Sequence, residues 1–165
     1  MFKLNHNKPV YLKILIALLL LLTGFSPRTS AQDMTEKGVP LLQNFTPTEY
    51  NHRGKIWDID TAPNGIVYMA ADRGLVEYDG ARWKDYNGSD GITRSLLVVS
   101  DTLIYTGSDL DFGVWKRNAF NDFEYTSLYP FKEDLNQIRE EFWNVHILNN
   151  NVFFVSSSNV YVYSD

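Results

Sequence analysis

Three side chains are candidates for ligand binding because they lie at matching positions of three similar segments. Trp57, Arg94 and Trp143 each stand near the start of the first strand that the segment predicts. Indole rings stack on apolar faces of ligands, and a guanidinium forms charge-assisted hydrogen bonds with carboxylates. Placed around a common channel mouth, these residues predict a site for a sugar or an acidic glycan. In the alternative, both indoles pack between neighbouring sheets and Arg94 pairs with a structural carboxylate.

A second group of candidate ligand-binding residues lies in the loops that join the second and third predicted strands. It comprises Asp72, Arg73, Asp109 and Asp111. Asp109 and Asp111 could ligate calcium, but this cation takes about six to eight oxygen ligands and two carboxylates fall well short. The sequence therefore predicts no metal site, and solvated turn residues are the alternative to a ligand site.

Sequence signatures of an enzyme are absent. The histidines after residue 31, His52 and His146, have no spacing typical of a metal site or a Ser-His-Asp triad. Glu140 and Glu141 are adjacent, so on a strand they point to opposite faces and do not form a glycosidase pair unaided. The glycines fall at predicted turns rather than in a phosphate-binding loop. We expect a non-enzymatic protein without a cofactor.

The elements that must position these candidates are short strands, which follow one another from residue 55 onward. The alternation of apolar and polar residues and the spacing of turn residues predict a four-stranded meander in about 32 residues. Two further segments repeat its order. Tyr68 and Tyr105 lie 37 residues apart, Gly74 and Gly113 lie 39 apart, and Phe154 follows Tyr105 by 49. The predicted units span residues 55–87, 92–128 and 141–165.

Units of four strands at this period indicate a β-propeller. A β-sandwich also has short, regularly spaced strands, but its strands need not resemble one another at a fixed offset. We therefore predict an all-β fold, a partial β-propeller of about three four-stranded blades with the last incomplete. Closed propellers have about four to eight blades, so we expect the N-terminal piece of a longer protein. Residues 32–54 are a lead-in and a candidate ring-closing outer strand, and open edges predict self-association.

The N-terminus has the layout of a secretory signal peptide over residues 1–31. Lysines precede an apolar run from Ile14 to Phe25, and small residues at Thr29 and Ala31 suit cleavage before Gln32. The alternative is a membrane anchor, but the run is shorter than the roughly 20 residues that span a bilayer. We expect an exported protein, periplasmic or extracellular, with no membrane insertion after cleavage.

Charge and cysteine content exclude further classes. The 134 residues after the predicted cleavage carry 11 basic and 20 acidic side chains, a net charge of −9. Such a surface repels phosphate backbones, so nucleic-acid binding is not expected. The absence of cysteine excludes disulfides, thiol catalysis and thiolate metal sites.

The stretch "NGIVYMAADRGLVEYDG" (Asn64 to Gly80), after "IWDID" and before "RWKDY", resembles the two-component regulator propeller repeat. The lead-in "GVPLLQNFTPTEYNHRGKIWDI" resembles the start of the sensor region of large bacterial regulators that also carry a triple-tyrosine module. The resemblance extends over about Gly38 to Asp165. In such regulators a periplasmic propeller precedes a tyrosine-rich β-sandwich, a transmembrane helix and a histidine kinase or DNA-binding output domain. None of these later parts has a counterpart among the 165 residues.

The resemblance implies the sensor or ligand-binding region of a two-component or one-component regulator, which recognises a small molecule or glycan fragment. Two other functions stay open at this point: a fragment of a propeller-type glycan-active enzyme, and an interaction scaffold at the cell surface.

Overall fold

The computed structural model describes residues 8–24, 41–50, 54–88, 91–131 and 139–164, and it divides the chain into two compact units, Met1–Leu42 and Gln43–Asp165. The first unit contains one apolar helix, α1 (Lys8–Gly24). Among the described residues, no helix combines the length and the apolar character needed to cross a membrane. The predicted cleavage site before Gln32 lies outside the described residues, so cleavage stays a prediction.

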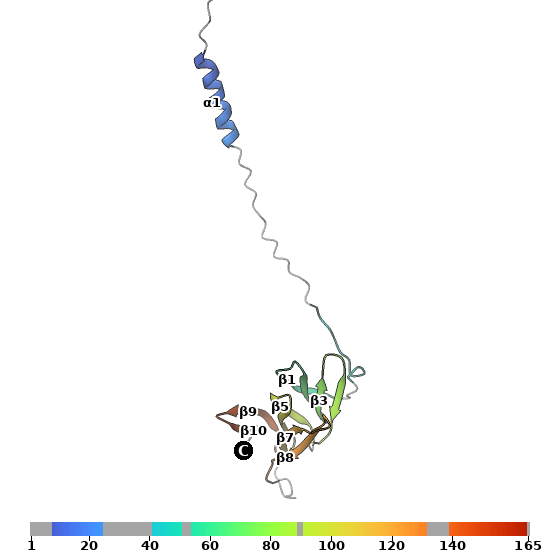
Figure 1. Ribbon diagram of the computed structural model, residues 1–165. Helices are drawn as coiled ribbons and strands as arrows, with labels where there is room; N and C mark the ends of the chain where they lie inside the picture. Colours follow the sequence, from blue (N-terminus) through green and yellow to red (C-terminus); the bar gives the residue numbers. More distant parts are fainter. Residues whose placement is uncertain (1–7, 25–40, 51–53, 89–90, 132–138, 165) are drawn as a thin grey trace, which may run out of the picture. The chain divides into compact units, whose positions relative to one another are not determined.

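The second unit consists of three antiparallel sheets that follow one another in the chain (Figure 1). In each sheet every strand pairs with the next strand in sequence, which gives the orders β1-β2-β3-β4, β5-β6-β7-β8 and β9-β10-β11. We refer to these sheets as blades 1, 2 and 3. The strands are β1 (Ile56–Thr61), β2 (Val67–Ala71), β3 (Gly74–Tyr78), β4 (Trp83–Tyr86), β5 (Thr93–Ser100), β6 (Leu103–Ser108), β7 (Phe112–Arg117), β8 (Phe123–Ser127), β9 (Phe142–Leu148), β10 (Asn151–Ser156) and β11 (Val160–Ser164).

Turn residues at both ends of β2 fix the first meander. The Asn64 side chain accepts a hydrogen bond from Ile66 N at 3.1 Å, and Gly65 adopts φ 86°, which glycine reaches without strain. Gly74 opens β3 with φ 127°, and a Cβ there would lie 2.3 Å from the Tyr86 carbonyl oxygen. Only glycine fits at this close approach of β3 and β4, so the glycine that precedes Leu75 has a steric reason.

Neighbouring blades pack face to face and enclose two hydrophobic clusters. Tyr68 and Leu75 of blade 1 pack with Ile104 and Trp115 of blade 2. The second cluster joins blades 2 and 3 in the same way, with Tyr105, Phe112, Val114, Phe142, Val145, Val152 and Phe154 among its members. Stacked antiparallel sheets of this kind form a partial propeller-like all-β fold, as predicted, with a third blade of three strands.

Hydrogen bonds between the first strands hold the inner edges of the blades together. Asp58 Oδ2 accepts from Leu96 N at 3.0 Å, and Asp60 Oδ2 accepts from Val98 N at 2.9 Å. The two carboxylates therefore bridge β1 to β5, and they do so along the strands rather than at turns. Ser95 Oγ donates to the Phe142 carbonyl at 2.9 Å and links β5 to β9.

The lead-in is described only at residues 41–50 and 54, where it forms no strand. The Phe45 ring contacts Tyr78 and Trp83 of blade 1, with centroid distances of 5.2 and 5.1 Å. The proposed ring-closing strand over residues 32–54 stays a prediction.

The offset of 49 residues from Tyr105 to Phe154, which the sequence predicts for the second strand of the third repeat, is wrong by one residue. Tyr68 pairs with Asp60 and Tyr105 pairs with Leu97, and the matching pair in blade 3 is His146 with Phe153 rather than with Phe154. Phe154 faces blade 2 and is fully buried there. The error arises because two adjacent phenylalanines satisfy the same sequence pattern, while only strand register distinguishes the two faces of a sheet.

Candidate functional site

The three inner strands each carry a one-residue interruption of their pairing at one of the three predicted site residues, and β5 carries a second one between Val98 and Ser100. The partners shift between Ile56 and Asp58, between Thr93 and Ser95, and between Phe142 and Asn144. Each shift leaves one residue without a partner on the second strand of its blade, namely Trp57, Arg94 or Trp143. Irregularities of this type bend a strand and re-aim a side chain, and they are frequent next to functional sites.

The three re-aimed side chains meet. The Arg94 guanidinium carbon lies 4.8 Å from the Trp57 ring centroid and 4.4 Å from that of Trp143. The two indoles are 6.3 Å apart between centroids and inclined at 73°. Both distances from the cation are within the range of favourable cation–π contact. We call Trp57, Arg94 and Trp143, with the carboxylates that bind Arg94, the inner-strand cluster.

Two carboxylates from different blades bind Arg94. Arg94 Nε donates to Asp109 Oδ1, and Arg94 Nη2 donates to Asp109 Oδ2 at 3.2 Å. The same Nη2 also donates to Glu141 Oε1 at 3.2 Å. The side chains of Arg94 and Asp109 are only 9% and 13% exposed, whereas that of Glu141 is 46% exposed. Arg94 thus pairs with a largely buried carboxylate, which is the contact that the alternative interpretation predicts, and its part in ligand binding stays a prediction.

Asp72 positions the Trp57 indole. Its Oδ1 accepts a hydrogen bond from Trp57 Nε1 at 2.7 Å, and its Oδ2 accepts from Lys55 N at 3.0 Å. Arg73, the next residue, is exposed at the same turn. Five of the candidate residues thus belong to one connected set of contacts, namely Trp57, Asp72, Arg94, Asp109 and Trp143.

Asp111 lies apart from this set. It is fully buried, and its Oδ1 accepts a hydrogen bond from Ser127 Oγ at 2.6 Å, which ties the start of β7 to the end of β8. Asp109 instead faces Arg94, so the two carboxylates considered for calcium serve different partners. Over the described ranges, no group of three or more potential metal-binding side chains occurs.

The accessible part of the inner-strand cluster is aromatic and anionic. Trp143 is 42% exposed, and Glu141 offers oxygens that are only partly used by Arg94. An anionic ligand would have to compete with two carboxylates already bound to the arginine. The cluster is therefore suited to a neutral ligand that has an apolar face for stacking and hydroxyl groups to donate.

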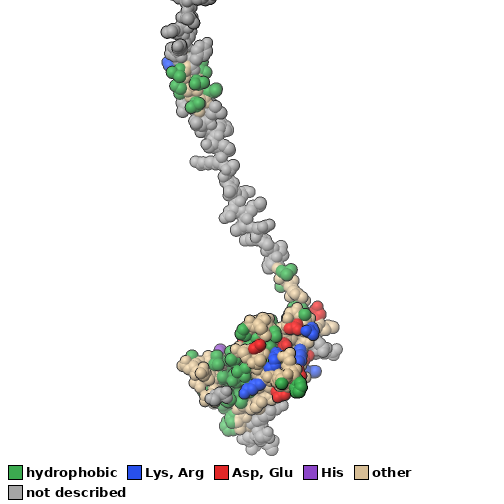
Figure 2. Space-filling view, viewed as in Figure 1, with side chains coloured by type: hydrophobic (Ala, Val, Ile, Leu, Met, Phe, Trp, Pro, Cys, Tyr) green, Lys and Arg blue, Asp and Glu red, His purple; other side chains and the backbone are tan. Residues whose placement is uncertain are grey.

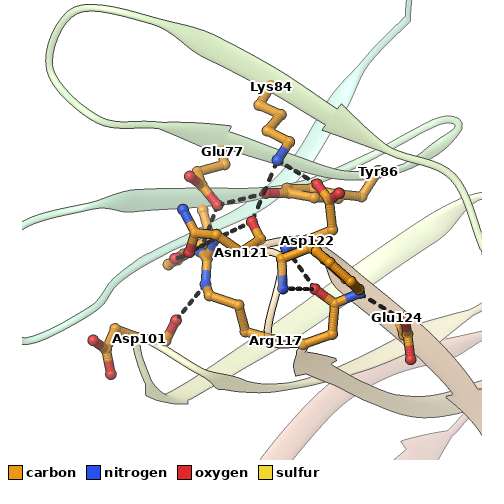
Figure 3. A network of polar contacts seen from close by, with 11 residues as sticks. Glu77, Lys84, Tyr86, Asp101, Arg117, Asn121, Asp122 and Glu124 are labelled. Carbon is orange, nitrogen blue, oxygen red and sulfur yellow. Dashed lines mark hydrogen bonds and ion pairs between the residues drawn. The ribbon is translucent and has the colours of Figure 1, made fainter.

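A polar network that the sequence analysis does not predict lies between blades 1 and 2 (Figure 3). Arg117 Nη2 donates to Glu77 Oε2 at 2.7 Å and to Tyr68 Oη at 2.8 Å, while Tyr86 Oη donates to the same Glu77 oxygen at 3.1 Å. The guanidinium also lies 4.2 Å from the Phe123 ring centroid. Burial raises the pKa of Tyr68, and the Glu77 charge raises it further. Strand alternation places Glu77 on the face of Leu75 and Arg117 on the face of Trp115, but it does not show that these two faces pack together.

A crevice of about 280 Å³ lies beside this network, lined by Glu77, Asp79, Arg82, Trp83, Lys84 and Asn121. Most of its charges already have partners: Lys84 binds Asp122, and Asp79 accepts from the backbone N–H groups of Ala81 and Arg82. The face in view in Figure 2 likewise has acidic and basic side chains interspersed rather than separated by sign. This crevice does not select a ligand class.

Comparison with known proteins identifies a similar fold. No protein-family model matches the chain, and no curated protein sequence matches it. The extracellular domain of BT4673 from B. thetaiotaomicron, a candidate one-component system, has a similar structure, with a TM-score of 0.50 and 15% identity over 67% of this chain. A second structure of that domain, described as a candidate hybrid two-component system, gives a TM-score of 0.49 and 16% identity over 67% of this chain. The chain spans 14% of the length of each solved chain.

Proposed function

We propose that residues 43–165 are part of the extracytoplasmic sensor region of a bacterial signal-transduction regulator. The observation that carries the proposal is the shared fold with the extracellular domain of BT4673. The apolar run from Ile14, most of which lies in α1, follows Lys3, Lys8 and Lys13, and this layout is consistent with export. The regulator would be of the two-component or one-component type, with its output domain in a further part of the protein.

The ligand that we propose is a neutral glycan fragment bound at the inner-strand cluster. Trp143 supplies an exposed stacking surface and Glu141 supplies hydrogen-bond acceptors. Arg94 holds both of them in place, because its guanidinium contacts the Trp143 ring and the Glu141 carboxylate at once. An acidic glycan fits less well, because the pairing of Arg94 leaves it little capacity for another anion.

The role is non-enzymatic in this proposal, and the partners of the two adjacent glutamates support it. Glu140 is 5% exposed and accepts hydrogen bonds from Tyr161 Oη at 2.8 Å and from Asn159. Glu141 turns to Arg94. Glu140 thus binds residues of blade 3 itself, whereas Glu141 links blade 3 to blade 2, so the two carboxylates serve different partners.

Export and membership of a regulator can be tested directly. Alkaline phosphatase fused after residue 165 should be active in a bacterial host, because the enzyme folds only outside the cytoplasm, and deletion of residues 1–31 should abolish that activity. Sequencing the gene downstream of codon 165 should reveal a transmembrane helix and a kinase or DNA-binding domain. An inactive fusion, or a stop codon at that position, would contradict the proposal.

A further inference from the structure

The Arg94 guanidinium has two edges that bind carboxylates through a pair of parallel N–H groups, one formed by Nε and Nη2 and the other by Nη1 and Nη2. Asp109 occupies the first edge, because Nε donates to its Oδ1 and Nη2 to its Oδ2. Glu141 Oε1 accepts from the same Nη2 at 3.2 Å, which engages one side of the second edge. The bonds from Arg94 to the described residues leave Nη1 unused. Glu141 is therefore the residue that stands between this edge and a ligand carboxylate.

The two carboxylates that bind Arg94 differ in burial. The Asp109 side chain is 13% exposed and accepts from two nitrogens, whereas the Glu141 side chain is 46% exposed and accepts from one. Water-exposed ion pairs contribute little to stability, while a buried charge that loses its partner is strongly destabilising. Asp109 is thus the fixed partner of Arg94, and Glu141 can be removed at little cost to the fold.

The charges around Arg94 do not balance. Asp109 and Glu141 face each other across an isolated antiparallel bridge, so their two negative charges and the single positive charge of Arg94 leave a net charge of −1. Like charges at opposed positions repel one another, and a ligand carboxylate would add a third. The hydroxyl groups of a sugar carry no charge, so they can accept from Nη1 and donate to Glu141 without this repulsion.

The unused edge of Arg94 lies close to the proposed stacking surface. The guanidinium carbon is 4.4 Å from the ring centroid of Trp143, which is 42% exposed. A substituent of a sugar in contact with this ring therefore comes close to the arginine and to Glu141.

We propose that Glu141 determines which ligand charge the inner-strand cluster accepts. Its carboxylate blocks the Nη1–Nη2 edge of Arg94 and excludes sugars that carry a carboxylate, while its Oε2 accepts a hydrogen bond from a sugar hydroxyl. The inference rests on the proposed function, because it concerns the same cluster and the same class of ligand. It adds that one exposed side chain, rather than the cluster as a whole, excludes acidic sugars.

A titration with glucuronate tests this role, with glucose as the neutral probe. Tryptophan fluorescence of the full-length chain in mild detergent is followed at constant ionic strength. Glu141→Ala should bind glucuronate about tenfold more tightly than the parent does, because the Nη1–Nη2 edge of Arg94 becomes free for a bidentate carboxylate. Glu124→Ala is the matched control: it also removes one negative charge, but Glu124 is exposed on β8, the outermost strand of blade 2. This control should bind glucuronate as the parent does.

Two further variants show whether the anion binds Arg94. Glu141→Gln removes the charge but keeps an oxygen that accepts from Nη2, so its gain should be smaller than that of Glu141→Ala. This isosteric variant carries the same test if the alanine variant is less stable in urea. Arg94→Lys combined with Glu141→Ala should lose the gain, because lysine has no planar pair of N–H groups. A gain that persists would assign the anion to Lys55, whose Nζ lies 5.3 Å from the Trp57 ring centroid, and would overturn the proposal.

The outcomes separate this inference from the proposed function. If the parent binds neutral oligosaccharides and neither Glu141 variant gains affinity for glucuronate, the role of Glu141 is overturned and the glycan sensor stands. If Glu141→Ala gains affinity for glucuronate while the parent binds no oligosaccharide, the role of Glu141 is supported and a glycan ligand is contradicted. An equal gain by Glu124→Ala would show an effect of net charge alone and would also overturn the proposal.

Discussion

Replacement of Arg117 by methionine should destabilise the contact between blades 1 and 2. Methionine preserves most of the apolar stem but removes the guanidinium that binds Glu77 and Tyr68. Both partners are then left in a poorly hydrated place, because the Glu77 side chain is 12% exposed and Tyr68 is fully buried. Tyr86 still donates one hydrogen bond to Glu77, so the carboxylate keeps part of its stabilisation.

The size of the effect follows from these contacts. Removing one partner of a buried ion pair costs about 3–5 kcal/mol, mostly because the other charge stays buried without compensation. The remaining exposure of the pair and the bond from Tyr86 place the expected loss at the lower end, about 3 kcal/mol. For a domain with a total stability of about 5–15 kcal/mol this is a large fraction.

Urea unfolding followed by tryptophan fluorescence measures this change. Lys84→Met is the matched control, because the Lys84–Asp122 pair has side chains that are 46% and 55% exposed. A surface pair of this type contributes about 0–1 kcal/mol. The double variant Arg117→Met/Glu77→Leu should recover part of the loss, since no unpaired charge remains buried. If Arg117→Met costs no more than Lys84→Met, the reasoning about the buried pair is refuted.

Three other changes test the blade packing. Gly107→Ala should cost about 1–3 kcal/mol in urea unfolding, because its Cβ would lie 2.7 Å from Phe142 Cβ of the next blade; a neutral substitution would contradict the close approach. Asp60→Ala should cost about 1–3 kcal/mol in the same assay through loss of the bond to Val98 N, whereas an unchanged midpoint would deny the bridge between inner strands. Burial raises the pKa values of Tyr68, Tyr86 and Tyr161 above their usual 10.0, so the folded state holds these protons more tightly than the unfolded state. The contribution of these tyrosines to stability should thus be constant from neutral pH up to about pH 10 and fall above it, and a melting temperature that stays constant through alkaline titration would contradict this.

Much of the fold could be predicted because it depends on local signals. Asn64-Gly65 marks a turn by its own backbone preferences, and alternation of apolar residues marks each strand. Strand register could not be predicted in this way, since a shift of one residue exchanges the two faces of a strand. The choice between Phe153 and Phe154 therefore needed the observed pairing with His146.

In the candidate site, too, the local features could be predicted from the sequence and the contacts between distant residues could not. Trp57, Arg94 and Trp143 could be aligned from the sequence because each lies near the start of a similar strand. The interruptions of pairing that re-aim them have no composition signal, and the partners of Arg94 come from loops and strands far along the chain. Arg117 and Glu77 are 40 residues apart, and only the packing of two blades shows that they form one network.

The binding of neutral oligosaccharides to the full-length chain, measured by isothermal titration calorimetry, tests the central claim most directly. A panel of neutral and uronic-acid oligosaccharides should contain a neutral member that binds. Trp143→Ala should abolish this binding without a change in the unfolding midpoint, while Phe120→Ala, at an exposed turn away from the cluster, should bind as the parent does. Preference for the acidic members, or undiminished binding by Trp143→Ala, would contradict a neutral-glycan sensor site at the inner-strand cluster.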